Sequence, residues 1–286
     1  MRVGRIPYIN CYPVYGGVDR GLVPLAATLV DGVPTALNRM MAEGELDVSV
    51  VSAVEYARDS ERYLLLPELA ISCDGPVRSV MLFSNHPAED LGGKRVLVSR
   101  SSMTSVHLLE LLFEHVWKCR PEFVPGNAEA DAVAAQAGDD VAARLVIGDA
   151  ALMLQSADHP VAQGHGRSYQ HVYDLGAEWK NWTGLPFVFA VWVAQRSTPV
   201  EDSLKVHAAL IRSRDWGLQH LDELSAQASR STGVSLAECR EYFAGLDWRL
   251  TMPDLEGLTE FLRRLELAGR VPKGQLAFLP AAGSRR

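Results

Sequence analysis

Strand and helix patterns alternate along the first part of this chain, and that order limits the folds open to it. Residues 35–43 have the amphipathic pattern of a helix, with Gly44 just past its end. Residues 45–51 then form a short apolar run typical of a buried strand. Another helix is expected to begin at Ser52, because Glu55 three residues later completes a capping-box pattern. This alternation predicts right-handed βαβ packing and a largely parallel sheet.

A second unit of strand and helix follows a polar turn. Residues 94–99 have the apolar pattern of a strand, and residues 106–115 have the periodicity of a helix. Residues 185–193 are again apolar and extended, which is typical of a strand that returns to the first unit. We therefore expect the chain to leave one lobe near Ser84, build a second, and come back near Phe189.

The predicted fold class is α/β, with two lobes that each hold a mainly parallel sheet flanked by helices. Lobe 1 is expected to combine residues 1–85 with residues 190–286, and lobe 2 to span residues 86–189. The two extended strands that cross between the lobes would form a hinge. Because ligand pockets concentrate at domain interfaces, we expect a ligand cleft between the lobes.

The composition argues against several functional classes. With 286 residues, of which 48% are hydrophobic and 22% charged, the chain can bury a core of ordinary globular proportions. Its net charge of -7 and its dispersed Lys and Arg residues argue against a nucleic-acid partner, which needs clustered positive charge. No apolar run reaches the length of a signal peptide or a membrane span, so we expect no membrane partner and a cytoplasmic location.

Neither the cysteines nor the histidines form a recognisable metal site. The four cysteines stand far apart without a C-x-x-C pair, which argues against both a disulfide scaffold and a zinc site. His107, Glu110 and Glu114 have a helical spacing, but one exposed helix face gives the same pattern. The G-x-S-x-G and H-E-x-x-H motifs are both absent. We therefore predict a site without metal or cofactor.

Residues 5–14 form a proline-braced turn that carries several polar side chains. Pro7 removes a donor from the first strand and Pro13 fixes another backbone angle, so the strand must end in a shaped turn. Tyr8 and Asn10 lie in this turn, and open α/β sheets bind ligands in the loops that follow the carboxyl ends of strands. A tight turn whose tyrosines pack on the core would use the same residues. Both interpretations stay open on the local sequence.

A loop rich in hydroxyl groups, residues 99–105, lies between a strand and a long helix. Its backbone N–H groups and hydroxyls at the positive helix terminus predict an anion site. The loop lacks the lysine and glycines of a nucleotide-binding loop, so a carboxylate is a better ligand than a triphosphate. Ordinary helix capping by Ser102 or Thr104 is the alternative. Ser52 has the same two interpretations, and there capping is favoured over ligand contact.

Residues 144–149 place a glycine and an acid at the end of another predicted strand. Gly148 would let a ligand approach the backbone closely, because it has no side chain. Asp149 could cap the next helix or reach the cleft, and the sequence does not decide between these two roles.

Five segments together resemble the MqnA family of chorismate dehydratases, which act in the futalosine route to menaquinone. The resemblance spans nearly the whole chain, and the combination is far more specific than any one motif. The segments are residues 5–14 (RIPYINCYPV), 44–57 (GELDVSVVSAVEYA), 75–80 (GPVRSV), 101–106 (SSMTSV) and 147–150 (IGDA). The resemblance implies a two-lobe fold like that of type II periplasmic binding proteins, without the export signal and with two crossover strands as hinge.

The resemblance also implies a reaction and the residues that serve it. Chorismate would lose water to give 3-[(1-carboxyvinyl)oxy]benzoate. Asn10 and Ser79 match the polar positions that face substrate in the family, and they are the candidate catalytic residues. The hydroxyl-rich loop matches the family's carboxylate-binding helix terminus. The candidate substrate-binding residues are Tyr8, Ser52, Ser102, Thr104, Ser105, Gly148 and Asp149.

The chemistry of chorismate fits a site without metal. Loss of the ring C3 proton and the C4 hydroxyl makes the ring aromatic, and the enolpyruvyl carboxylate of the substrate could act as the base. The enzyme would then contribute positioning and desolvation. Two alternatives stay open: a non-catalytic cytoplasmic binding protein for a small carboxylate, and the sister enzyme 1,4-dihydroxy-6-naphthoate synthase. The opening turn of that enzyme is more like Ser-Pro-Cys-Pro-Asn-Asp, which this chain lacks.

Overall fold

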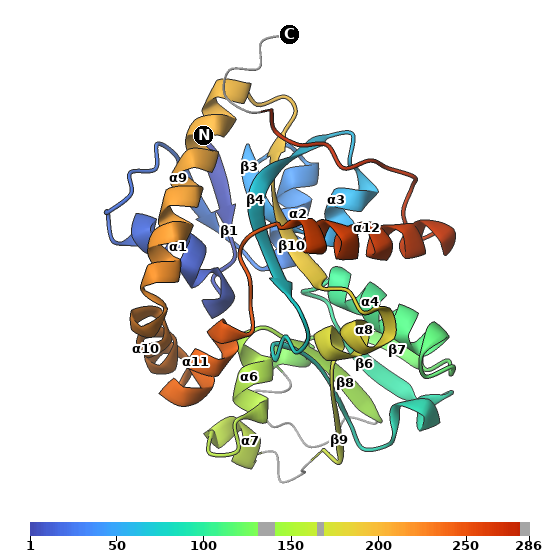
Figure 1. Ribbon diagram of the computed structural model, residues 1–286. Coiled ribbons are helices and arrows are strands. Elements are labelled where there is room, and N and C mark those ends of the chain that lie inside the picture. Colours follow the sequence, from blue (N-terminus) through green and yellow to red (C-terminus); the bar gives the residue numbers. More distant parts are fainter. Residues whose placement is uncertain (131–140, 165–168, 281–286) are drawn as a thin grey trace. The chain divides into compact units, whose positions relative to one another are not determined.

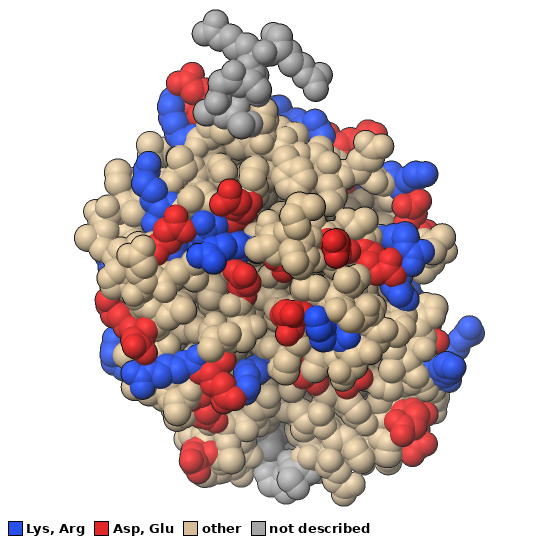
Figure 2. Space-filling model, in the orientation of Figure 1, with Lys and Arg blue, Asp and Glu red and all other residues tan. Residues whose placement is uncertain are grey.

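The computed structural model describes residues 1–130, 141–164 and 169–280 (Figure 1). The chain forms two compact units. Unit 1 comprises Met1–Ser72, Val188–Leu224 and Asp247–Arg286, and unit 2 comprises Cys73–Phe187 and Ser225–Leu246. None of the described helices has both the length and the apolarity needed to cross a membrane. Acidic and basic side chains are interspersed over the face drawn in Figure 2.

Unit 1 is built on a five-stranded sheet. Its strands are β1 (Arg2–Arg5), β2 (Thr28–Asp31), β3 (Val48–Ser52), β4 (Tyr63–Cys73) and β10 (Phe187–Gln195), in the order β2-β1-β3-β10-β4. Its helices are η1 (Ile9–Cys11, a 3-10 turn), α1 (Tyr12–Asp19), α2 (Pro34–Ala42), α3 (Ala53–Arg58), α9 (Val200–Gln219) and α12 (Met252–Leu267). The helix α10 (Leu221–Thr232) begins in unit 1 and ends in unit 2.

The centre of this sheet is fully buried and of mixed direction. Every residue of β3 and of β10 is buried, as expected for strands covered on both faces. The strand β1 pairs in parallel with β2 and β3, whereas β10 pairs with β3 in the antiparallel direction, with Val191 opposite Val51. The prediction of a mainly parallel sheet therefore holds for β2-β1-β3 and is corrected at β10, because an apolar run does not encode strand direction.

Unit 2 holds a second five-stranded sheet. Its strands are β5 (Val80–Ser84), β6 (Arg95–Ser99), β7 (Glu122–Gly126), β8 (Ala143–Ile147) and β9 (His171–Asp174), in the order β7-β6-β8-β5-β9. Its helices include η2 (Ala88–Leu91), α4 (Thr104–His115), α6 (Asp149–Gln155), α7 (Pro160–Gly164), α8 (Leu175–Thr183) and α11 (Leu236–Ala244). The strand β6 is parallel to β7 and β8, and β5 is antiparallel to β8 and β9.

The boundaries of the two units differ from the lobes of residues 1–85 plus 190–286 and residues 86–189 that the sequence suggested. Residues 73–85 belong to unit 2, because β5 lies between β8 and β9 in the second sheet. Residues 225–246 also belong to unit 2, because Tyr242 and Glu241 of α11 bond to the turn that precedes β5. Helical periodicity places a helix in the chain but does not say which sheet it joins.

Candidate functional site

The turn that carries Asn10 is braced from several sides. Pro13 lies in the first turn of α1, and Gly217 of α9 comes so close that a Cβ there would stand 2.2 Å from the Pro13 carbonyl oxygen. The indole N–H of Trp248 donates to the backbone carbonyl of Asn10 at 2.6 Å. These contacts fix the backbone around Asn10, because one is a hydrogen bond to Asn10 itself and the other is close helix packing three residues later, at Pro13.

The side chain of Asn10 has a buried oxygen without a hydrogen-bond partner among the described residues. Buried polar atoms are nearly always paired in folded proteins, and an unpaired one is costly. The flanking Ile9 and Cys11 are buried, whereas Tyr8 and Asn10 are half-buried. The amide of Asn10 can therefore accept a hydrogen bond from a bound molecule at this turn.

A small pocket lies beside the Asn10 turn. It has a volume of about 160 Å³ and includes Arg5, Tyr12 and Tyr15 in its wall. The Arg5 guanidinium donates to Asp31 at 2.6 Å and is paired with Asp19. The hydrogen bond from Arg5 holds the pKa of the Asp31 carboxyl below its usual range. Since two carboxylates already offset the charge of Arg5, this guanidinium is poorly suited to bind a further anion.

The Ser52 hydroxyl accepts two hydrogen bonds that stabilise the local structure. It accepts the backbone N–H of Glu55 at 3.2 Å, which confirms the predicted cap of α3, and it accepts the Asn38 side-chain amide at 3.0 Å. The Asn38 side chain in turn accepts the backbone N–H of Ser52 at 3.1 Å. Contact of Ser52 with substrate stays a prediction.

Strand direction brings the predicted residues of unit 1 to one edge of its sheet. The strands β1 and β3 are parallel neighbours, with Val3 opposite Val48. Their carboxyl ends therefore lie at the same edge, where the Asn10 turn follows β1 and Ser52 ends β3. In sheets of this kind that edge is where ligands bind.

The predicted residues of unit 2 also gather at one edge. The strands β6 and β8 are parallel neighbours, and β5 is antiparallel to β8 with Val80 opposite Ile147. The loop after β6, the loop after β8 and the turn before β5 therefore leave the sheet at the same side. The residues at this edge are Ser79, Ser102, Thr104, Ser105, Gly148 and Asp149.

Ser79 and Gly148 are joined by a backbone hydrogen bond. The backbone N–H of Gly148 donates to the Ser79 carbonyl at 2.8 Å. Gly148 has a φ of 65°, a conformation that a residue with a side chain rarely adopts. Asp149 occupies the first turn of α6, where its negative charge suits the helix dipole, and the cap position itself belongs to Gly148.

Asp174 holds the turn that carries Ser79, a role that the sequence pattern did not indicate. Its carboxylate accepts the backbone N–H groups of Val77 at 3.0 Å and Arg78 at 2.6 Å. It also caps α8 by accepting from Gly176 and Ala177. Arg78 has a φ of 62°, so this turn is strained and needs such support. The cap could have been found from an Asp between a strand and a helix, but its bonds to a distant turn could not.

Two serine side chains of the hydroxyl-rich loop already accept hydrogen bonds from nearby backbone N–H groups. Ser102 Oγ accepts the backbone N–H of Ser105 at 3.2 Å, and Ser99 Oγ accepts that of Ser101 at 2.9 Å. Ser102 therefore pairs one N–H of the first turn of α4, as a capping side chain would, although the cap position itself is Met103. Thr104 and Ser105 are buried in the first turn of α4, and their binding of a carboxylate stays a prediction.

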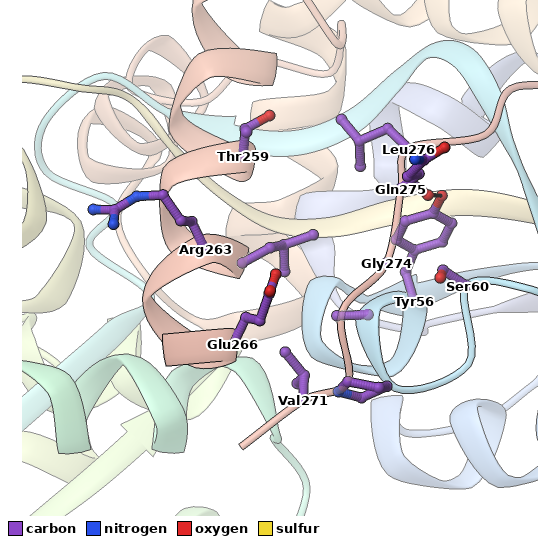
Figure 3. A pocket seen from close by; sticks show the side chains of 12 residues that line it. Tyr56, Ser60, Thr259, Arg263, Glu266, Val271, Gly274, Gln275 and Leu276 are labelled. Carbon is purple, nitrogen blue, oxygen red and sulfur yellow. Dashed lines mark hydrogen bonds between the residues drawn. The ribbon is translucent and has the colours of Figure 1, made fainter. Parts of the chain in front are cut away.

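No group of three or more His, Cys, Asp or Glu side chains in the described part of the chain could hold a metal ion. His107 instead pairs with Glu110 at 2.9 Å. Figure 3 shows a mainly apolar pocket of about 330 Å³ formed by α3, α12 and residues 271–276. None of the nine predicted site residues lines that pocket.

The chain is similar in sequence to several known proteins. The model of a family described as menaquinone biosynthesis matches residues 1–267. A chorismate dehydratase of Thermus thermophilus is 31% identical over 91% of this chain and 96% of its own length. A 1,4-dihydroxy-6-naphtoate synthase of the same organism is 29% identical over 78% of this chain and 76% of its own length.

A solved structure supports the fold class. A Candida albicans protein described as having the generic periplasmic binding protein fold matches with a TM-score of 0.64 at 12% identity, over 99% of this chain and 98% of its own. At that identity the match shows the fold alone. The α/β fold of the periplasmic-binding-protein type that the sequence predicted is thereby confirmed.

Proposed function

This chain belongs to the menaquinone-biosynthesis family, and we propose that it is a chorismate dehydratase. In this proposal the protein is a hydro-lyase that converts chorismate to 3-[(1-carboxyvinyl)oxy]benzoate and water. The observation that supports it most is the amide oxygen of Asn10, which is buried at the carboxyl edge of the first sheet and has no hydrogen-bond partner in the described part of the chain. The cytoplasmic location expected from the sequence is part of the same proposal.

The elimination needs a base at ring carbon C3 and help for the departing C4 hydroxyl. The C3–H electron pair becomes a ring double bond as the C4–O bond breaks, and the C3 proton passes to the base. The departing hydroxide then takes that proton from the protonated base and leaves as water. The enolpyruvyl carboxylate of chorismate acts as the base in this proposal. The protein then supplies orientation and a dry, preorganised site.

Asn10 and Ser79 take complementary roles in the proposal. An amide has no useful proton equilibrium near neutral pH, so Asn10 cannot be the base, but it can donate to one oxygen and accept from another. It would hold the C4 hydroxyl or the enolpyruvyl carboxylate in place. Ser79 would donate its hydroxyl proton in a hydrogen bond to an oxygen of the substrate. A hydrogen bond to the C4 oxygen stabilises the charge that develops as the C4–O bond breaks, and a hydrogen bond to the enolpyruvyl carboxylate orients the base.

The ring carboxylate of chorismate needs a separate anion site. The first turn of α4 offers Thr104 and Ser105 with backbone N–H groups at a positive helix end, and Ser102 holds that end in shape. Gly148 lets the substrate approach the neighbouring backbone. Each of these contacts uses a residue at the same edge of the second sheet as Ser79.

The test is to incubate the purified protein with chorismate, without added cofactor, and to follow the product by mass. The proposal expects chorismate to be replaced by a species lighter by one water. Chorismate that binds but stays intact would favour a binding protein. Turnover of cyclised dehypoxanthine futalosine instead would favour the sister enzyme. That enzyme is the second candidate, because a 1,4-dihydroxy-6-naphtoate synthase is also similar to this chain.

A further inference from the structure

The hydroxyl of Tyr242 donates to the Ser79 hydroxyl oxygen at 3.0 Å, across 163 positions of sequence. Both side chains are buried, with 1% of Tyr242 and 3% of Ser79 exposed. We propose that Tyr242 is a positioning residue, which orients the Ser79 hydroxyl so that its proton points to the substrate. This inference rests on the proposed dehydratase function and adds a residue outside the set that the sequence suggested.

A serine hydroxyl has one proton to donate and two lone pairs that accept. Tyr242 occupies one of those lone pairs, so the Ser79 proton is directed elsewhere. The backbone of Ser79 is already fixed, because its N–H donates to Val77 at 2.7 Å and its carbonyl accepts from Gly148. The side-chain torsion of Ser79 is the remaining freedom, and the bond from Tyr242 restricts it.

The helix that carries Tyr242, α11, is bonded both to the Ser79 turn and to the end of α6. Glu241 pairs with Arg78 at 2.5 Å, next to Ser79. At the start of α11, Glu238 completes a capping box with Ser235 and also accepts the Ser156 hydroxyl at 2.9 Å. The hydrogen bond from Ser235 holds the pKa of the Glu238 carboxyl below its usual range, so this anchor is charged at neutral pH.

The bonds of Glu241 and Glu238 hold α11 in place relative to the Ser79 turn more firmly than the Tyr242–Ser79 hydrogen bond could by itself. The helix is distant in sequence from β5, yet it packs within the same compact unit. A purely structural Tyr242 would fill space and stabilise the unit. A positioning Tyr242 would in addition affect catalysis, and only through the Ser79 hydroxyl.

A double-mutant cycle separates these two roles. The variants are Y242F, S79A and the pair together, each tested for kcat, KM and melting temperature with chorismate. We expect Y242F to lower kcat by about 3- to 10-fold, the usual effect of losing one hydrogen bond, with KM little changed. In the S79A background Y242F should cause no further loss of kcat. The matched control is Y63F, which removes another buried tyrosine hydroxyl, bonded to Glu55 in unit 1, and should keep wild-type kcat.

Each result bears on the inference. Wild-type kcat in a well-folded Y242F protein overturns it, and so does an equal loss of kcat from Y242F in both backgrounds, which would mark a structural effect. If Y242F melts early, the comparison of S79A with the double variant at a temperature where both are folded still decides. A wild-type protein that leaves chorismate unchanged removes the proposed function itself, whereas an active wild type with an indifferent Y242F removes only the inference.

Discussion

Trp248 holds the backbone of Asn10 from the far end of the chain, through a 2.6 Å hydrogen bond that spans 238 positions of sequence. Trp248 is 1% exposed, so its indole is packed on every side. The backbone of the same residue is bonded to β4, because the Trp248 carbonyl accepts from Ala70 at 3.4 Å. The C-terminal part of unit 1 therefore fixes the turn at its N-terminus.

Replacing Trp248 by Phe should damage both stability and turnover. The change leaves the Asn10 carbonyl without its donor, and we expect the free energy of unfolding to fall by about 1 to 3 kcal/mol, with kcat/KM lowered as well. Urea unfolding and steady-state kinetics measure the two effects. The matched control is W192F, which removes an indole N–H bonded to Tyr15 at 3.0 Å in the same unit and should cost stability without a specific loss of kcat/KM. Equal kinetic losses in both variants would contradict a specific role for the Trp248 bond.

Replacing Asn10 by Asp keeps the shape of the side chain but, in the proposed site, places a negative charge beside the dianionic substrate. We expect kcat/KM to fall at least about a hundredfold, roughly 2.7 kcal/mol of transition-state stabilisation, with little change in melting temperature. Steady-state kinetics and a thermal melt on the same preparation check this. Near-normal turnover in a folded protein would remove Asn10 from the mechanism, and loss of folding would make the turn purely structural.

Serine substitutions in the hydroxyl-rich loop should separate capping from binding. Ser105→Ala should weaken chorismate binding by roughly 1 to 2 kcal/mol, the range for a hydrogen bond to a charged group. Ser102→Ala removes the bond to the Ser105 N–H and should lower stability by about 0.5 to 2 kcal/mol. Calorimetric titration and chemical unfolding measure the pair. Unchanged affinity in Ser105→Ala would leave this loop as a helix cap.

Glu55 gives a prediction about pH. Burial raises the pKa of its carboxyl, and the carboxyl accepts the Tyr63 hydroxyl at 3.2 Å. A raised pKa in the folded state means that the stability from the protonated form is present below the unfolded value, about pH 4.3, and is lost as pH rises through the folded value. Glu55→Gln stays neutral, so its free energy of unfolding relative to wild type should increase from acid to neutral pH. A difference that shrinks over that range in urea unfolding would contradict this.

The sequence predicted local structure well, because local structure follows local pattern. The strand before Ser52, the cap at Ser52 and the strand that ends at Ser99 all appear where apolar periodicity and capping residues indicated. Their parallel pairing then brings the expected polar residues to the carboxyl edges of two sheets. That step needs only the alternation of strands and helices.

What the sequence did not predict depends on contacts between distant segments. The direction of β10 and the placement of β5 in unit 2 are set by pairing partners, which an apolar run does not specify. The carboxylate of Asp174, the hydroxyl of Tyr242 and the indole of Trp248 each bond to a turn far away in sequence. A single chain read without homologues contains no signal for such pairs, since each residue type is also common in ordinary caps and cores.

Proton NMR of chorismate incubated with this protein shows directly whether the protein makes the chorismate ring aromatic. The measurement is made in buffer with EDTA and no added cofactor, beside an equal amount of Asn10→Asp protein. We predict that the cyclohexadiene signals of chorismate disappear while aromatic ring signals grow and the enolpyruvyl methylene signals remain, and that the variant is far slower. Cyclohexadiene signals that persist unchanged in the presence of folded wild-type protein would show that it is not a chorismate dehydratase.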